Sequence, residues 1–163
     1  MVRKKEEIIK LAHKILPLIQ SHYGERLITL AIFGSTARDN LRKESDVDFL
    51  LILKAPLPSY GKRVKEFMEI WGRILEIWVD KGGVILPPSF LILSETEAKK
   101  HPSIFLDMTD KVIILFDRDD FLKRELTRLR KKMEELGSRK VYTPHGWYWI
   151  IKPGLKLGEK YKL

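Results

Sequence analysis

The sequence predicts a single mixed α/β domain in which a small sheet is flanked by helices. Short apolar runs of strand length alternate along the chain with longer segments whose apolar residues recur at helical spacing. An alternation of helix and strand from end to end indicates a mixed α/β fold. The chain has 163 residues, which suits one domain with a buried core, so residues 1–163 are treated as a single unit.

The first half of the chain is expected to contain two long helices and three strands. The helices cover the segments with helical spacing, residues 4–22 and 61–80. The strands cover three shorter runs: residues 27–33, 46–53 and 84–93. Pro17 is expected to kink or shorten the first helix, because proline removes a backbone donor. Pro87 and Pro88 predict an edge position or a bulge in the third strand.

The second half is expected to add further helices and a fourth strand. Ser94 and Glu97 have the spacing of a capping box, which begins a helix. Residues 111–116 predict a strand, and residues 119–136 predict a helix whose leucine stripe belongs to the core rather than to a partner seam. Residues 147–149 are expected to alternate between the faces of a short strand and to pack against the last helix. A solvated, lysine-rich tail follows.

The charge balance favours a polyanionic partner. Lys and Arg number 31 against 22 Asp and Glu, which gives a formal net charge of +9. Such an excess suits nucleic acid, nucleotides or an acidic protein surface, with a solvated basic surface as the alternative. The chain has one Asn and one Gln although 33% of its residues are charged. This composition is typical of thermophile proteins.

No membrane segment, export signal or cysteine chemistry is expected. No apolar run approaches the roughly 20 residues that span a bilayer, and the amino terminus lacks the apolar core of a secretory signal. The chain has no cysteine, which excludes disulfides and thiolate metal sites. No pair of histidines has metal-ligand spacing with a nearby acid, so surface or capping roles are expected for them. We therefore expect a cytoplasmic protein.

Two acids stand at the head of the second strand. Residues i and i+2 of a strand project from one face, so the carboxylates of Asp46 and Asp48 should lie together and Val47 should pack on the other face. Two like charges about 7 Å apart repel, and each resists desolvation. A divalent cation relieves both costs, and Mg²⁺ suits the task because it takes carboxylate oxygens and bridges to phosphates. The alternative is a pair of acids that only ends the strand in solvent.

Gly34 and Ser35 stand where the first strand ends. Glycine lets the backbone approach a ligand closely. The N–H groups of a following helical turn and the Ser35 hydroxyl can hold phosphate oxygens. Taken alone, Gly-Ser is a plain turn. Beside Asp46 and Asp48 at one edge of a sheet, it predicts a phosphate cradle next to a two-carboxylate metal site, the arrangement for attack on a nucleotide α-phosphate.

These residues resemble a known signature. Gly34-Ser35, ten further residues and then Asp46-Val47-Asp48 are similar to the GS-x10-DxD motif of the minimal nucleotidyltransferases, in the polymerase-beta-like superfamily. The surrounding residues fit as well: Phe33, Ala37-Arg38, Ser45 and the run FLLIL. The resemblance covers a core of about residues 5–95. Residues 96–163 would form a helical and aromatic extension, and its WYWIIKPG segment is similar to the end of an archaeal branch of such proteins.

The resemblance implies a polymerase-beta-like nucleotidyltransferase fold with a small mixed sheet. It also implies transfer of a nucleoside monophosphate from a triphosphate to a hydroxyl, with release of pyrophosphate. The Gly-Ser pair would hold the β- and γ-phosphates, and the two acids would bind Mg²⁺, with Mn²⁺ as the alternative ion. ATP is the expected substrate, with another nucleoside triphosphate as the alternative. Arg38 and Lys43 would be candidates for contacts with the triphosphate.

The sequence departs from the family pattern in one respect. Catalytic members place a third carboxylate on the next core strand, where it helps to bind metal and can deprotonate the acceptor. The matching segment VILPPSFLIL has no acid between Asp80 and Glu95, and Ser89 stands where an acid is expected. Glu76 or Asp80 could substitute only if residues 73–80 were a strand, and their spacing favours a helix.

Three functions stay open. The first is an active transferase with a protein acceptor; family analogy suggests AMP transfer to a tyrosine of a HEPN-type toxin, which would make this chain an antitoxin. The second is a nucleotide- or partner-binding module without catalysis, which the missing third acid favours. The third is an enzyme or binder that acts on RNA, which the net charge favours. The sequence leaves the acceptor, the base and the oligomeric state open.

Overall fold

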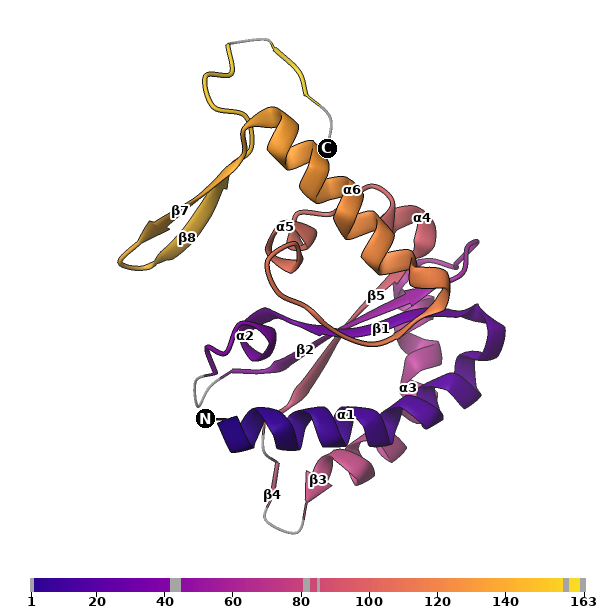
Figure 1. Cartoon of the computed structure of the whole chain (residues 1–163). Helices are drawn as coiled ribbons and strands as arrows, with labels where there is room; N and C mark the ends of the chain where they lie inside the picture. Colours follow the sequence, from indigo (N-terminus) through magenta and orange to yellow (C-terminus); the bar gives the residue numbers. More distant parts are fainter. Residues whose placement is uncertain (1, 42–44, 81–82, 85, 157–158, 162–163) are drawn as a thin grey trace.

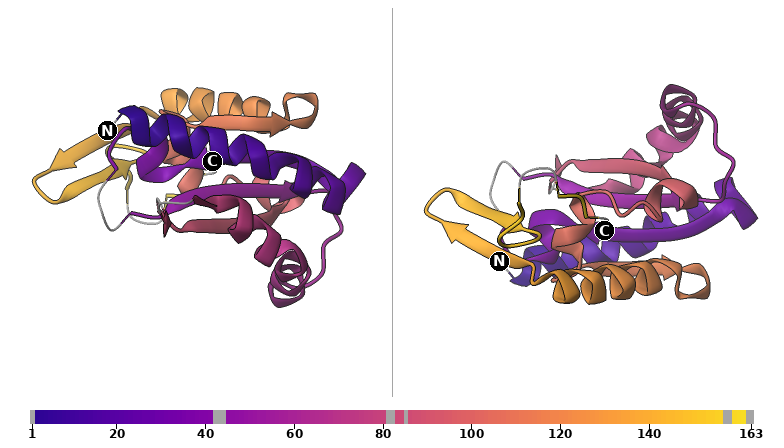
Figure 2. Two further views of the ribbon diagram at one scale, coloured as in Figure 1. Left: turned by 90° about the horizontal axis from the view of Figure 1, so that it is seen from below. Right: turned by 90° about the horizontal axis from the view of Figure 1, so that it is seen from above.

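A four-stranded sheet lies between two layers of helices in the computed structural model (Figure 1). The structure describes residues 2–41, 45–80, 83–84, 86–156 and 159–161. Helices α1 (Val2–Tyr23) and α3 (Tyr60–Trp78) cover one face of the sheet. Helices α4 (Glu95–Ala98), α5 (Ile104–Met108) and α6 (Phe121–Leu136) cover the other, as Figure 2 also shows. The predicted mixed α/β architecture is confirmed.

The sheet is mixed and has the strand order β5-β2-β1-β6. Its strands are β1 (Leu27–Phe33), β2 (Val47–Leu53), β5 (Pro88–Ser94) and β6 (Ile113–Asp117). Strand β1 is antiparallel to both β2 and β6, whereas β2 and β5 are parallel. The end of β1 therefore lies beside the start of β2, and the start of β2 lies beside the start of β5.

The two central strands form the core because their side chains are buried on both faces. In β2, Val47, Phe49 and Leu51 pack with α1 and α3, whereas Leu50 and Ile52 pack with α5 and α6. All five side chains are fully buried, and this explains why the strand reads as a continuous apolar run. Val47 packs away from the neighbouring acids, as predicted.

The remaining elements are short. They are the 3-10 turns η1 (Gly24–Arg26) and η2 (Arg118–Asp120), the helical turn α2 (Gly34–Ala37), the strand pair β3 (Val79–Asp80) and β4 (Gly83–Val84), and the hairpin β7 (Arg139–Thr143) and β8 (Gly146–Ile150). The hairpin projects from the carboxyl end of α6 on the side of the molecule where α2 lies (Figures 1 and 2). It is the strand predicted for residues 147–149, now paired with a partner strand.

Two expectations about proline were wrong in part. Helix α1 continues through Pro17 to Tyr23 and is not shortened, because the buried Ile15, Leu18 and Ile19 hold its apolar face on the sheet. The strand expected over residues 84–93 is divided at its proline pair into β4 and β5. The predicted edge position of β5 is confirmed.

The predicted capping box at the start of α4 is confirmed and is linked to a partly buried ion pair. Ser94 Oγ accepts the Glu97 backbone N–H at 3.1 Å, and the Glu97 carboxylate accepts the Ser94 N–H at 2.7 Å. The carboxylate of Glu97 also receives the guanidinium of the buried Arg63 at 2.6 and 3.0 Å. The pair ties α3 to α4 across the edge of the sheet.

This ion pair predicts how the free energy of unfolding changes at low pH. The Arg63 guanidinium, working against the effect of burial, lowers the pKa of Glu97 from the ordinary 4.5 to about 2. The resulting stabilisation is complete above the ordinary pKa and is lost as the pH falls through the folded-state pKa. We expect Glu97→Gln to lower the free energy of unfolding near neutral pH by about 1 kcal/mol, since the carboxylate is partly exposed. Below pH 4.5, the free energy of unfolding measured in urea should then fall less steeply with decreasing pH for the variant than for the unaltered chain. Equal slopes would contradict this assignment.

No helix in the described part of the chain is both long and apolar enough to cross a bilayer.

Candidate active site

The sheet brings the Gly-Ser turn and the acid pair to one edge. Phe33, the last residue of β1, is paired directly with Asp48 of β2. Gly34 and Ser35 begin α2 immediately after Phe33, so the turn lies beside the start of β2. The expected common edge is therefore present, and it follows from the antiparallel pairing of these two strands.

Gly34 makes the closest approach in this site. Its φ is +69°, and a Cβ atom built on it would lie 2.2 Å from Asp48 Oδ2. Any other residue would have both an unfavourable backbone conformation and a collision with the carboxylate. Glycine at position 34 thus lets the turn pack directly against the acid.

Asp46 and Asp48 form an electrostatically unfavourable pair. Asp46 is exposed just ahead of β2, and Asp48 is half-buried. Burial raises the pKa of Asp48, the charge of Asp46 raises it further, and Arg38 opposes both effects. Two carboxylates that destabilise each other at a sheet edge, with hard oxygen donors and partial access to solvent, fit a divalent cation such as Mg²⁺.

Arg38 directly follows the α2 turn and lies within the electrostatic reach of Asp48. Its guanidinium Nη1 is 3.5 Å from Asp107 Oδ2. The guanidinium carbon, Cζ, lies 4.6 Å from the centre of the Trp147 ring. The next residue, Asp39, has φ of +62° and pairs with Lys5 at 2.6 Å and with Lys111 at 3.4 Å, which fixes the end of the turn. Lys43, the other basic candidate, lies outside the described residues.

Asp107 joins this turn to the β7–β8 hairpin. Its carboxylate accepts the indole N–H of Trp147 at 2.9 and 3.1 Å and that of Trp149 at 2.9 Å, and it pairs with Lys140 at 3.3 Å. Burial alone would raise the pKa of Asp107, but the hydrogen bonds from Trp149, Trp147 and Lys140 outweigh it and lower the pKa. The hairpin is thus held against α5 and Arg38.

The expectation that these tryptophans pack against the last helix needs correction. Trp149 packs at the edge of the cluster that contains α6 residues, but the indole N–H groups of Trp147 and Trp149 both bond to Asp107 of α5. The reason is that buried indoles need an acceptor, which the apolar face of α6 cannot offer. No local pattern marks Asp107 in the sequence, because its partners are distant along the chain on both sides, Arg38 before it and Lys140 after it.

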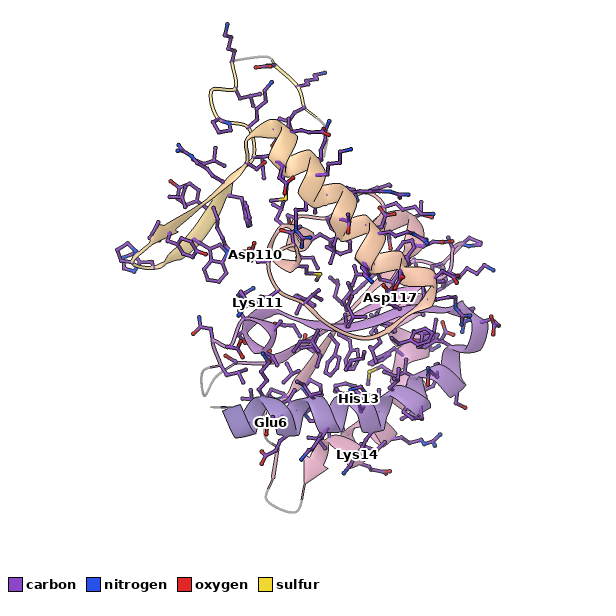
Figure 3. All side chains as sticks on the ribbon, in the orientation of Figure 1. Glu6, His13, Lys14, Asp110, Lys111 and Asp117 are labelled. Atoms are coloured by element: carbon purple, nitrogen blue, oxygen red, sulfur yellow. The ribbon has the colours of Figure 1, made fainter. Side chains whose placement is uncertain are left out.

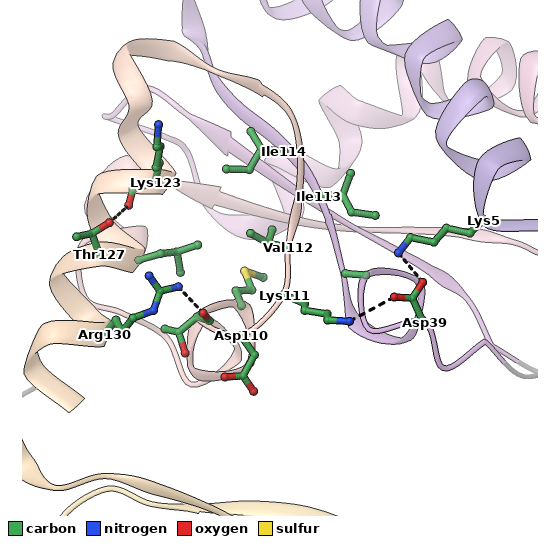
Figure 4. Close-up of a pocket in the computed structure, with 14 residues that line it drawn as sticks. Lys5, Asp39, Asp110, Lys111, Val112, Ile113, Ile114, Lys123, Thr127 and Arg130 are labelled. Atoms are coloured by element: carbon green, nitrogen blue, oxygen red, sulfur yellow. Dashed lines mark hydrogen bonds and ion pairs between the residues drawn. The ribbon is translucent and has the colours of Figure 1, made fainter. Parts of the chain in front are cut away.

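A cavity of about 710 Å³ separates the turn from the hairpin. Ser35, Arg38 and Asn40 line one side of it, and the hairpin residues 142–147 line the other. A second cavity of about 410 Å³ lies between α1, β6 and α6 (Figure 4). The cations Lys5 and Lys111 at its rim are already paired with Asp39, and neither acid of the candidate metal site lines it.

Comparison with known proteins identifies the family. Residues 12–143 match the family described as "Nucleotidyltransferase domain". The chain belongs to this family. A Methanocaldococcus jannaschii protein named "Putative protein adenylyltransferase MJ1305" is 27% identical over 117 residues, which are 72% of this chain and 77% of that protein. The predicted membership of a nucleotidyltransferase family is confirmed, and both similarities support nucleotidyl transfer as the activity.

Solved structures confirm the fold of this nucleotidyltransferase. Spectinomycin adenyltransferase AAD(9) of Enterococcus faecialis, in complex with ATP and spectinomycin, matches with a TM-score of 0.54 at 16% identity. The match covers 78% of this chain and 66% of that one. A toxin–antitoxin structure with AMP-PNP matches with a TM-score of 0.45 at 14% identity, over 82% of this chain and 92% of that one. The match to the spectinomycin adenyltransferase confirms the predicted polymerase-beta-like fold.

This nucleotidyltransferase has a serine where the family pattern predicts a third acid. Ser89 is paired with Asp48 in the parallel β2–β5 register, so both side chains leave the same face of the sheet. Ser89 is exposed, whereas Glu76 lies within α3 and Asp80 belongs to β3, away from this register. Among the residues that the structure describes, no three acids or histidines come together as a metal site.

Proposed function

We propose that the chain is a Mg²⁺-dependent nucleotidyltransferase that transfers AMP from ATP to a hydroxyl group of a protein. The observation that carries the proposal is the contact between the Gly34 turn and the Asp48 carboxylate, since it places a phosphate-binding turn against an acid pair. The name of the Methanocaldococcus jannaschii relative, a protein adenylyltransferase, supports both AMP and a protein acceptor. A HEPN-type toxin is the acceptor that the family resemblance suggests.

Each residue has a proposed role in this reaction. Asp46 and Asp48 would hold the cation, which supplies charge neutralisation for the phosphates when bound. The Ser35 hydroxyl and the Gly34 backbone would hold the outer phosphates. Arg38 would neutralise charge on the departing pyrophosphate, and Lys43 stays a sequence-based candidate for the same task.

The reaction exchanges one bond at the α-phosphorus for another. The acceptor oxygen forms a bond to this phosphorus as the bond to the bridging oxygen of pyrophosphate breaks, and the hydroxyl proton leaves to solvent. Phosphoryl and nucleotidyl transfer depend mainly on positioning and charge stabilisation rather than on proton abstraction. A serine in place of the third acid would therefore slow the reaction without excluding it.

A transfer assay with ATP labelled at the α-phosphate tests the proposal. The pure chain, Mg²⁺ and a HEPN-type protein as the candidate acceptor are incubated at elevated temperature, since the composition suggests a hot-adapted source. Label on the partner protein supports an adenylyltransferase. If neither ATP nor any other labelled triphosphate gives transfer, the proposal fails, and Ser89 then favours the second candidate, a nucleotide-binding module. Label on added RNA instead would favour the RNA-directed alternative.

Ser89→Asp tests the reason for the expected slow rate. The new carboxylate would stand beside Asp48 on the same face of the sheet and complete a three-acid site. We expect roughly tenfold faster transfer, since a positioned acid contributes at least that much in comparable sites, and tighter binding of Mn²⁺ measured by calorimetry. Ser89→Asn is the matched control, because asparagine has the same size as aspartate but no charge. Equal rates for the two variants would show that position 89 does not contribute to the reaction.

A further inference from the structure

The cavity between α2 and the hairpin is built to receive an anion. The described residues that line it are Ser35, Arg38, Asn40, Ser45, Tyr142, Thr143, Pro144, His145, Gly146 and Trp147. They include no Asp or Glu, although several carboxylates lie nearby. Side chains that can donate hydrogen bonds thus face a space of about 710 Å³ from both walls.

The Gly-Ser turn joins the acid pair to the cavity. Asp48 contacts Gly34, whereas Ser35 and Arg38 line the cavity beyond it. A triphosphate whose α-phosphate lies at the acid pair would pass Ser35 and reach this cavity with its outer phosphates. This arrangement favours phosphate over the base as the group that the hairpin meets.

Arg38 is oriented by the hairpin. Its guanidinium lies over the Trp147 ring at 4.6 Å and reaches Asp107 at 3.5 Å, and the same carboxylate holds the Trp147 indole. Among the described residues, the buried Nε of Arg38 has no hydrogen-bond partner. A guanidinium with an unpaired donor indicates that an acceptor is missing from this site.

The hairpin tip brings further donors to the same space. Pro144 and His145 form the turn between β7 and β8, which Thr143 stabilises by accepting the His145 N–H at 3.3 Å. A neighbouring cavity of about 440 Å³ is lined by Arg38, Asp110, Lys111 and Lys140. Lys111 pairs with Asp39 and Lys140 pairs with Asp110. Figure 3 shows Lys111 between the hairpin and α2.

We propose that the β7–β8 hairpin is the outer wall of the polyphosphate site. Trp147 and Asp107 act as positioning residues for Arg38, and His145 contacts the terminal phosphate of the bound triphosphate. The proposal rests on the proposed function, since it takes Ser35 as a phosphate contact. It adds a wall that lies partly outside the family match, which ends at Thr143.

The experiment compares the affinities of tripolyphosphate, ATP and AMP for the whole chain by calorimetry in the presence of Mg²⁺. His145→Ala should weaken the binding of tripolyphosphate and of ATP equally, by about three- to tenfold, since it removes one hydrogen bond to a charged group in an exposed place. AMP, which has no outer phosphates, should bind the variant and the unaltered chain alike.

Tyr148→Ala is the matched control, because Tyr148 pairs with Val141 on the opposite face of the same hairpin and is 52% exposed. It should leave all three affinities unchanged. If His145→Ala weakened ATP but not tripolyphosphate, the hairpin would contact the base and the proposal would be wrong. It would also be wrong if His145→Ala changed no affinity or if the unaltered chain did not bind tripolyphosphate.

Failure of the proposed function gives a different result. A chain that binds tripolyphosphate through His145 but transfers no label from ATP would retain the polyphosphate wall without being a transferase. A chain that transfers label normally, with the same KM for ATP after His145→Ala, would be a transferase without this wall.

Discussion

Asp48→Asn is expected to abolish nucleotidyl transfer, with kcat/KM falling by about a thousandfold or more. The carboxylate lies against the Gly34 turn and shares the proposed cation with Asp46. Loss of a cation ligand removes several kcal/mol of charge stabilisation, and about 1.4 kcal/mol corresponds to each tenfold in rate. The labelled-ATP assay measures this effect, and single-turnover conditions separate slow chemistry from slow product release.

The same variant should be as stable as the unaltered chain or more stable. The pKa of Asp48 is raised in the folded protein, so stability falls as the pH rises from the ordinary pKa to the raised one and stays lower above it. A neutral amide removes this cost. Thermal unfolding at pH 7 without metal should show an equal or higher Tm. Glu134→Gln, on an exposed part of α6, is the control for loss of one negative charge. Retention of transfer by Asp48→Asn would refute the proposed site.

Gly34→Ala is expected to reduce transfer by roughly a hundredfold and to destabilise the fold. The added Cβ would lie 2.2 Å from Asp48 Oδ2 and 3.2 Å from its Cγ, so either the turn or the carboxylate must move. A displacement of about 1 Å at a reacting centre can cost two orders of magnitude in rate. The positive φ adds about 1–2 kcal/mol of backbone strain.

Gly24→Ala separates these two effects. Gly24 also has a positive φ, of +53°, but a Cβ there would meet nothing within 4 Å. This variant should show the strain alone, as a lower free energy of unfolding in urea, with transfer unchanged once the folded fraction is taken into account. If both variants lost stability equally and both kept full activity, close packing at Gly34 would have no part in the reaction.

The sequence was sufficient to predict the two central strands and the position of the acid pair at the head of the second. Short apolar runs around Ala31 and Leu50 could only be strands buried on both faces, and the polar residues at their ends had to lie at the sheet edge. The close approach of Gly34 to Asp48 follows from the same antiparallel pairing. The roles of these residues in binding and catalysis stay predictions.

The hairpin and its attachment could not be predicted from the sequence in the same way. Two five-residue strands have no stable pattern of their own, and they are held by side chains rather than by a sheet. The partners of Asp107 lie far along the chain, so no local spacing reveals them. The family resemblance already pointed to Ser89 as the position of the missing acid, whereas its register opposite Asp48 depends on a crossover through α3 that the sequence alone does not determine.

The attachment of the hairpin at Asp107 divides the molecule into parts that can evolve at different rates. The Gly-Ser turn is joined to a strand that packs with both layers of the interior, so a change in its backbone, as in Gly34→Ala, disturbs folding and chemistry together. The ribbon of residues 139–150 bonds to the body through two carboxylates close together in the chain, Asp107 and Asp110, and about half of it lies beyond the family match. Related chains could therefore exchange this ribbon, and with it the contacts to the outer phosphates, while the inherited centre stays intact.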